Sequence, residues 1–279
     1  MNLPFTTEEF LEVFKIYNLT VWPTQILLVI LALLMIFVLL KKNKLSDKII
    51  SIGLTLFWLW MGIVYHYLFF TKINGAAYVF GLLFVFQAVL FFYYGLIKRN
   101  LEFNFRNNFI GVISIILFLY ALIFYPLLGY QFGHLYPRTP TFGLPCPTTI
   151  FTFGMIILLA NRKNIIFIIP IVWSLVGFTA AIKLGIYQDI GLLIAGVLSA
   201  IILFTSLDQA KVKFIISSFF SLAYFSSAGL PSLLSMLTHL ATAVISKNFI
   251  PRALTSGLLS RSSIALNNAL NLFTPRVFE

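Results

Sequence analysis

The chain has 279 residues, of which 60% are hydrophobic and only 10% are charged, and its net charge is +11. Soluble domains carry roughly 25% charged residues, so this composition excludes a soluble fold, and we expect lipid around most of the surface. The basic residues form short clusters between apolar runs, a pattern typical of membrane-topology signals rather than of nucleic-acid binding. One cysteine excludes an intrachain disulfide and a Cys–Cys metal site.

The N-terminal segment, residues 1–21, is predicted to form a short amphipathic helix. Thr6 and Glu9 have the spacing of a capping box, Thr-x-x-Glu. Apolar residues then recur with helical spacing at Phe10, Val13, Phe14 and Tyr17. Two positions are open for this helix: it lies on the outer face of the membrane, or it packs over the helix bundle.

Seven apolar segments follow at short intervals, and most have about the 20 residues needed to cross a bilayer. They predict an all-α fold, a polytopic bundle of seven transmembrane helices within a domain that covers residues 22–210. The segments are 22–40, 49–70, 76–97, 109–129, 141–160, 165–183 and 190–207.

The connections between these segments alternate in charge. One set holds eleven basic residues, whereas the other set, counted with the N-terminal segment, holds four. Basic loops remain in the cytoplasm, so we expect the N-terminus outside and the end of the seventh helix in the cytoplasm. The eleven are Lys41, Lys42, Lys44, Lys48, Lys98, Arg99, Arg106, Arg162, Lys163, Lys211 and Lys213, and the four are Lys15, Lys72, Arg138 and Lys183.

The composition changes after Asp208, and residues 211–279 form a basic tail that is rich in serine. The stretch 214–246 carries no charged residue and is long enough for an eighth membrane segment, interrupted near Gly229 and Pro231. The remainder of the tail has no periodic pattern, which is typical of disorder.

Polar side chains within the apolar segments gather on the side predicted to face outward. Such groups are functional hypotheses by default, because they are costly to place in a membrane. Asp189 opens the last segment, and the longest connection, residues 130–147, is expected to fold onto the bundle as an ordered loop. The candidate ligand-binding residues are His66, Asn74, His134, Arg138, Cys146, Thr148 and Thr149.

The fifth segment is too short to cross a bilayer as regular helix. Prolines disfavour helix before Pro147, so helix runs only to about Ala160 and covers about 20 Å of a hydrocarbon core of about 30 Å. The helix start then lies about 10 Å below the outer surface, facing His66 at a depth of about 6 Å. Interrupted helices of this kind bind substrates in transporters, which predicts an outward-facing pocket here.

Other interpretations of these residues remain open. Cys146 between two prolines is also typical of a rigid helix entrance, where its small side chain is buried. His66 is also explained as a packing residue with a hydrogen bond. His134 is also explained as an ordinary loop histidine. A metal or haem site built from these three residues has no diagnostic spacing. A cysteine enzyme needs a base and an oxyanion hole that no motif provides, so we predict no cofactor, no metal and no catalytic residue.

Three stretches carry a resemblance to a known family, namely residues 3–10, residues 59–66 with Ile73 and Asn74, and residues 140–154. With them the chain resembles a family of bacterial multi-pass membrane proteins, domain of unknown function 6064, over residues 1–207. The resemblance implies an integral protein of the bacterial inner membrane and no established activity.

Three functions fit these observations, and we favour the first. It is a small-molecule transporter or binder with an outward-facing pocket at the start of the fifth helix, whose partners are the lipid bilayer and a small-molecule ligand. The second is a structural or assembly subunit of a homo- or hetero-oligomer, with small residues such as Gly177 and Ala181 at helix contacts. The third is a membrane-embedded thiol enzyme that uses Cys146.

Overall fold

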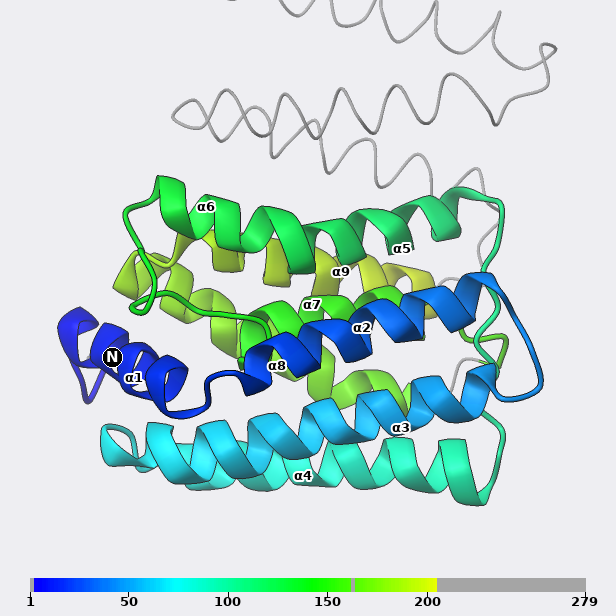
Figure 1. The fold of residues 1–279 in the computed structure, drawn as a ribbon, viewed down its shortest axis with the longest axis horizontal. Coiled ribbons are helices and arrows are strands. Elements are labelled where there is room, and N and C mark those ends of the chain that lie inside the picture. The colour runs from blue at the N-terminus through cyan, green and yellow to red at the C-terminus, as the bar shows by residue number, and fades with distance from the viewer. Residues whose placement is uncertain (1–2, 162–163, 205–279) are drawn as a thin grey trace, which may run out of the picture. The chain divides into compact units, whose positions relative to one another are not determined.

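The computed structural model describes residues 3–161 and 164–204 (Figure 1). This part of the chain is helical, which confirms the all-α prediction there. The predicted tail, residues 211–279 with the apolar stretch 214–246, and the end of the segment 190–207 lie outside the described residues.

Several of the helices continue one another, and π-helical or 3₁₀ turns join or follow them. In chain order the elements are α1 (Thr7–Thr20), α2 (Thr24–Leu40), α3 (Ser46–Leu59) with η1 (Trp60–Phe69) and η2 (Phe70–Lys72), α4 (Ala77–Phe92) with η3 (Tyr93–Ile97), α5 (Phe109–Leu119) with η4 (Tyr120–Phe124) and α6 (Tyr125–Gln131), α7 (Pro145–Ile156), α8 (Asn164–Leu184), η5 (Tyr187–Asp189) and α9 (Ile190–Phe204).

Within the described part of the chain, helix length and composition identify four helices that are long and apolar enough to cross a membrane. They cover Ser46–Lys72, Ala77–Ile97, Phe109–Gln131 and Ile165–Leu184. A fifth is added if α1 and α2, which meet at 84°, are counted as one broken span. The predicted segment 141–160 is helical only over the 12 residues of α7, so these lengths show four or five helices that could span a membrane, and they do not show the predicted seven.

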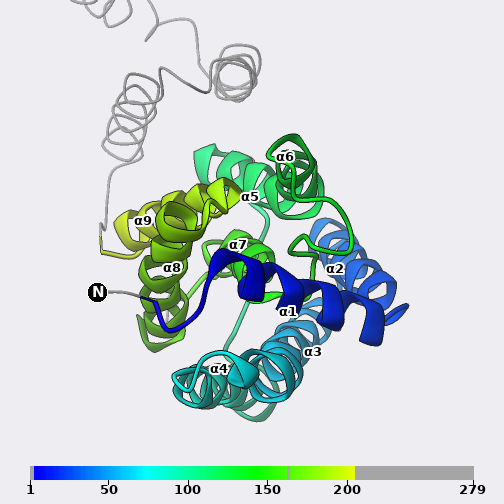
Figure 2. The ribbon, with the colours of Figure 1, turned by 90° about the vertical axis from the view of Figure 1, so that its left-hand side faces the viewer.

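The short helix α7 lies in the middle of the bundle, with the other helices around it (Figure 2). Every residue of α7 except Cys146 is buried, as expected for a helix that is apolar on all faces. Polar contacts add to this packing: Trp58 Nε1–H donates to Thr152 Oγ1 (3.1 Å), and Ser114 Oγ donates to the carbonyl of Gly154 (2.7 Å). The core of the protein therefore surrounds this helix.

The chain leaves the helix after α7 and forms backbone hydrogen bonds with the connection between α4 and α5. The N–H of Asn104 donates to the carbonyl of Leu158 (3.1 Å), and the N–H of Ala160 donates to the carbonyl of Glu102 (2.9 Å). Buried backbone polar groups need hydrogen-bond partners. This pairing provides partners just after the end of α7, so the helix can be shorter than its neighbours.

Helix α1 begins with the predicted capping box and crosses one end of the bundle (Figure 2). The Thr6 N–H donates to the Glu9 carboxylate (2.7 Å), and the Glu9 N–H donates to Thr6 Oγ1 (3.2 Å). Its apolar face is buried in a cluster with residues of η1, η2 and α8. Of the two positions open from the sequence, the described residues show packing over the bundle.

Asn18, which is fully buried in α1, fastens the loop between α6 and α7. Its amide nitrogen donates to the carbonyls of Pro137 (2.7 Å) and Thr139 (2.8 Å), and its amide oxygen accepts from the hydroxyl of Thr141 (2.7 Å). Gln25 in α2 donates to the backbone carbonyl of Asn18 (3.0 Å). The predicted ordered loop is thus held by side-chain contacts rather than by regular secondary structure.

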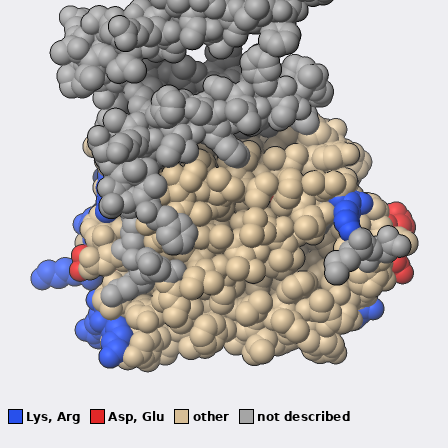
Figure 3. Space-filling model, turned by 180° about the vertical axis from the view of Figure 1, so that it is seen from behind, with Lys and Arg blue, Asp and Glu red and all other residues tan. Residues whose placement is uncertain are grey.

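On the face shown in Figure 3, the charged residues lie at the two ends of the bundle, and the described surface between them carries no charged side chain. Exposed Lys41, Lys44 and Lys98 belong to the end that carries the α2–α3 and α4–α5 connections, and Glu8 belongs to α1 at the opposite end. At the basic end, Asp47 accepts from Lys42 and from the N–H of Phe103 (2.7 Å). The charge separation that the sequence predicted is therefore also a separation in space.

The close approach of α7 to α5 predicts that Gly154→Ala is destabilising. A Cβ at this position would lie 2.6 Å from the Phe118 ring, and overpacking of this kind lowers the free energy of unfolding by about 1–3 kcal/mol. Thermal unfolding of the purified protein measures the change. Gly75→Ala is the matched control because a Cβ there has no atom within 4 Å; equal stability of the two variants would contradict this account.

The contacts of Asn18 predict that Asn18→Ala also lowers the unfolding temperature. The substitution leaves the carbonyls of Pro137 and Thr139 without their donor, and a buried unsatisfied group lowers stability by about 1–3 kcal/mol. Thr20→Ala removes an exposed hydroxyl from the same helix and should have little effect. If Thr20→Ala is as destabilising as Asn18→Ala, the Asn18 hydrogen bonds do not hold the loop.

Candidate functional site

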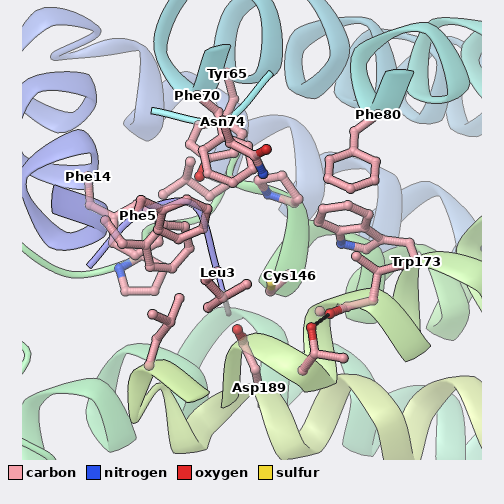
Figure 4. Close-up of a pocket in the computed structure, with 18 of the residues that line it drawn as sticks. Leu3, Phe5, Phe14, Tyr65, Phe70, Asn74, Phe80, Cys146, Trp173 and Asp189 are labelled. Carbon is pink, nitrogen blue, oxygen red and sulfur yellow. Dashed lines mark hydrogen bonds between the residues drawn. The ribbon is translucent and has the colours of Figure 1, made fainter. Parts of the chain in front are cut away.

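A cavity of about 200 Å³ lies at the first turn of α7, beside α1. Its walls come from the N-terminal segment, α1, η1, η2, α4, α6, α7, α8 and η5 (Figure 4). Leu3 lines the cavity together with Cys146 and Asp189, so the residues that precede α1 form part of the wall. The cavity exists because α7 is short, since a full-length helix would fill this space.

One side of the cavity is a continuous aromatic surface. The Phe70 ring lies 5.6 Å from Phe5, 5.7 Å from Phe10 and 5.6 Å from Tyr65, measured between ring centres. These residues come from two stretches that are far apart in the sequence: the N-terminal segment with α1, and η1 with η2. The aromatic surface therefore forms only when α1 packs over the bundle.

The opposite side carries Cys146 and the carboxyl group of Asp189 (Figure 4). Asp189 is only 2% exposed; the Tyr125 hydroxyl donates to Oδ1, and the Cys146 thiol is a second hydrogen-bond partner. Asp189 is the one charged residue among the described residues that line the cavity.

Asn74 and Cys146 are the two sequence candidates that line the cavity. Asn74 lies in the turn before α4, where its amide oxygen accepts from the N–H of Ala76 (3.0 Å). Cys146 is half-buried at the second position of α7. The structure thus brings together, at one cavity, the start of the helix in the predicted segment 141–160 and the turn that follows the predicted segment 49–70.

The structure places His66 behind the cavity wall, so it does not face Cys146 as predicted. Its ring lies 4.7 Å from the Phe84 ring and 5.3 Å from the Trp173 ring. Trp173 lines the cavity and separates the imidazole from it. His66 is fully buried, and neither ring nitrogen has a hydrogen-bond partner among the described residues.

Arg138 and His134 lie in the loop between α6 and α7 but do not line the cavity. Arg138 forms ion pairs with Glu8 and with Glu12 (2.6 Å), so its charge fastens the loop to α1. Burial lowers the pKa of the half-buried His134 imidazole. Arg138 therefore holds the loop to α1 from outside the cavity.

Thr148 and Thr149 are fully buried and belong to the packing of α7. Thr148 Oγ1 accepts from the N–H of Gly143 (2.9 Å), which fixes the chain as it enters the helix. The helix starts at Pro145 rather than at Pro147, and neither proline has an N–H. The predicted display of free N–H groups at this helix start is therefore reduced to that of Cys146.

Asp189, Tyr125 and Trp173 are the site residues that sequence reasoning missed. Asp189 was visible as a carboxylate between two apolar segments, a signal that marks a functional group in a membrane protein. Tyr125 and Trp173 gave no signal because aromatic residues are common throughout this chain. Within residues 3–161 and 164–204, no three His, Cys, Asp or Glu side chains are placed to hold a metal ion.

The comparisons with known proteins identify a family and no activity. The model of a family described as "Family of unknown function (DUF6064)" matches residues 7–213. No curated protein and no solved structure matches the chain. The chain therefore belongs to the DUF6064 family, as the sequence resemblance indicated.

The position of Cys146 predicts that a small neutral thiol reagent reaches it in the folded protein. Methyl methanethiosulfonate should label the protein once in lipid nanodiscs, because Cys146 lines the cavity, and mass spectrometry detects the added group. A polymer-linked maleimide should label it only after unfolding, and Cys146→Ser should remain unlabelled. If the small reagent also reacts only after unfolding, the cavity is closed to solutes of that size.

Proposed function

We propose that this member of the DUF6064 family is a multi-pass membrane protein that binds a small molecule in the cavity at the start of α7. It acts as a transporter or as a binding protein for that molecule. The observation that carries the proposal is the cavity at the first turn of a half-length central helix.

The length of α7 supports this proposal. Its 12 residues extend over about 18 Å, whereas the hydrocarbon core of a bilayer is about 30 Å thick. Irregular backbone is tolerated at membrane depth where it is buried in protein or lines a cavity, and the loop before α7 meets this condition. Interrupted helices next to a binding site are a common feature of transporters.

The proposed topology has seven crossings, with the N-terminus outside. The helices α2, α7 and α9 are shorter than the four long spans, and in this proposal they complete the seven with help from neighbouring loops. The basic end is cytoplasmic by the positive-inside rule. Because α1 and the cavity lie at the opposite end, the cavity faces outward.

The packing of small residues weakens the alternative of an assembly subunit. A Cβ at Gly177 would lie 2.6 Å from Leu192, and one at Gly191 would lie 2.3 Å from Tyr120. These glycines are therefore used in contacts inside the bundle, and they do not form a free surface for a partner. The thiol-enzyme alternative needs a base beside Cys146, and neither His66 nor His134 lines the cavity.

The cavity wall predicts that Val176→Phe abolishes ligand binding. Val176 lines the cavity, so a phenyl ring there fills much of its volume of about 200 Å³. Native mass spectrometry of protein released from its own membrane should show a bound small molecule on the wild type and none on this variant. Val172→Phe, one turn away and 46% exposed, should keep the bound mass.

Two outcomes would contradict the proposal. Wild-type protein that carries no bound mass in its own membrane, and none after incubation with membrane extracts, would indicate that the cavity is only a packing defect. A bound mass that survives equally in both valine variants would indicate lipid on the outer surface instead.

A further inference from the structure

The described wall of the cavity carries an acidic side chain and no basic one. Asp189 contributes a carboxyl group, and the described lining residues include no Lys, Arg or His. The two groups that contact this carboxyl, the Tyr125 hydroxyl and the Cys146 thiol, are uncharged donors. A buried carboxylate without a positive partner is unfavourable, so a ligand that brings a positive charge would be held strongly.

The aromatic surface faces Asp189 across the cavity and also favours a positively charged ligand. Tyr65 and Phe70 lie opposite the carboxyl group, and Phe80 with Trp173 closes the side, with their ring centres 5.4 Å apart (Figure 4). The faces of aromatic rings carry negative charge density and attract cations, most strongly where water is excluded. Carboxylate and rings therefore select for one sign of charge.

The remaining polar groups indicate which kind of cation fits. The Thr179 hydroxyl donates to the carbonyl of Val176 (2.6 Å), and the Asn74 amide oxygen accepts from the N–H of Ala76 (3.0 Å). Most of the other described lining residues are apolar or aromatic, so the walls offer few acceptors for the several N–H groups of a primary amine. An alkylated ammonium group, which needs few or no hydrogen bonds, matches these walls better.

We propose that the ligand of this cavity is an apolar organic cation, a tertiary or quaternary amine that is held between Asp189 and the aromatic surface. This inference rests on the proposed function, since it assigns a chemical class to the ligand of the same cavity. The volume of about 200 Å³ suits a molecule of the size of a substituted benzene and excludes a whole phospholipid.

A matched pair of probes tests the charge separately from the shape. Phenyltrimethylammonium and tert-butylbenzene have the same size and shape, and they differ only in the charged nitrogen. Isothermal titration of the full-length protein in lipid nanodiscs, with empty nanodiscs subtracted, gives both affinities. We expect the ammonium to bind at least tenfold more tightly than the neutral hydrocarbon.

Variants at Asp189 and Phe70 assign the preference to the two surfaces. Asp189→Asn should weaken ammonium binding at least tenfold and leave tert-butylbenzene within twofold, whereas Asp189→Glu should keep the preference for the cation. Phe70→Leu provides an independent readout if Asp189→Asn does not fold, and it should weaken ammonium binding about threefold while the hydrocarbon is unaffected.

The outcomes separate this inference from the proposed function. Equal affinities of the two probes for the wild type overturn the cation class and leave a small-molecule cavity in place. A cation preference that survives in Asp189→Asn also overturns it, because the charge would then be recognised elsewhere. If neither probe binds and no bound mass is found on the purified protein, both proposals fail.

Discussion

The structure depends on one constraint: α7, a helix of 12 residues that is too short to cross a bilayer, is buried at the centre of the helical bundle. Each end of α7 then lies among apolar side chains, where every backbone N–H and C=O needs a partner. At its C-terminal end, the pairing of Leu158 with Asn104 provides one. At its N-terminal end, the prolines remove two donors, and Gly143 bonds to Thr148 (2.9 Å).

The cavity and its covering follow from that constraint. The volume that a full-length helix would occupy is filled in part by α1 and by the loop between α6 and α7. The part that stays empty is the cavity. Asn18 joins α1 to the loop from within, and Arg138 joins the two from outside by its ion pairs with Glu8 and Glu12. Exposed ion pairs contribute little free energy, so the buried amide contacts are the stronger fastening.

Sequence reasoning reached part of the site, and the residues that it misplaced share one physical property. Asn74 and Cys146, which line the cavity, each lie next to the end of a helix, and helix ends follow from local composition. His66 was assigned to the cavity from its depth alone, but the direction of its side chain depends on packing against Phe84 and Trp173. Arg138 was predicted to bind a ligand because its ion pair with Glu8 could not be foreseen. The two residues lie 130 positions apart in the sequence.

By itself the sequence determined the local and one-dimensional properties of this protein: an apolar helical chain, the capping box of α1, the separation of charge between the two ends, and the break before α7. These depend on composition and on residues a few positions apart. The tertiary structure alone decided that α7 is the central helix, that α1 covers the cavity, and that Asp189 faces an aromatic surface. Such contacts join residues far apart in the sequence, from 40 positions for Ser114 and Gly154 to 121 for Asn18 and Thr139. Side-chain packing, which no local pattern encodes, selects them.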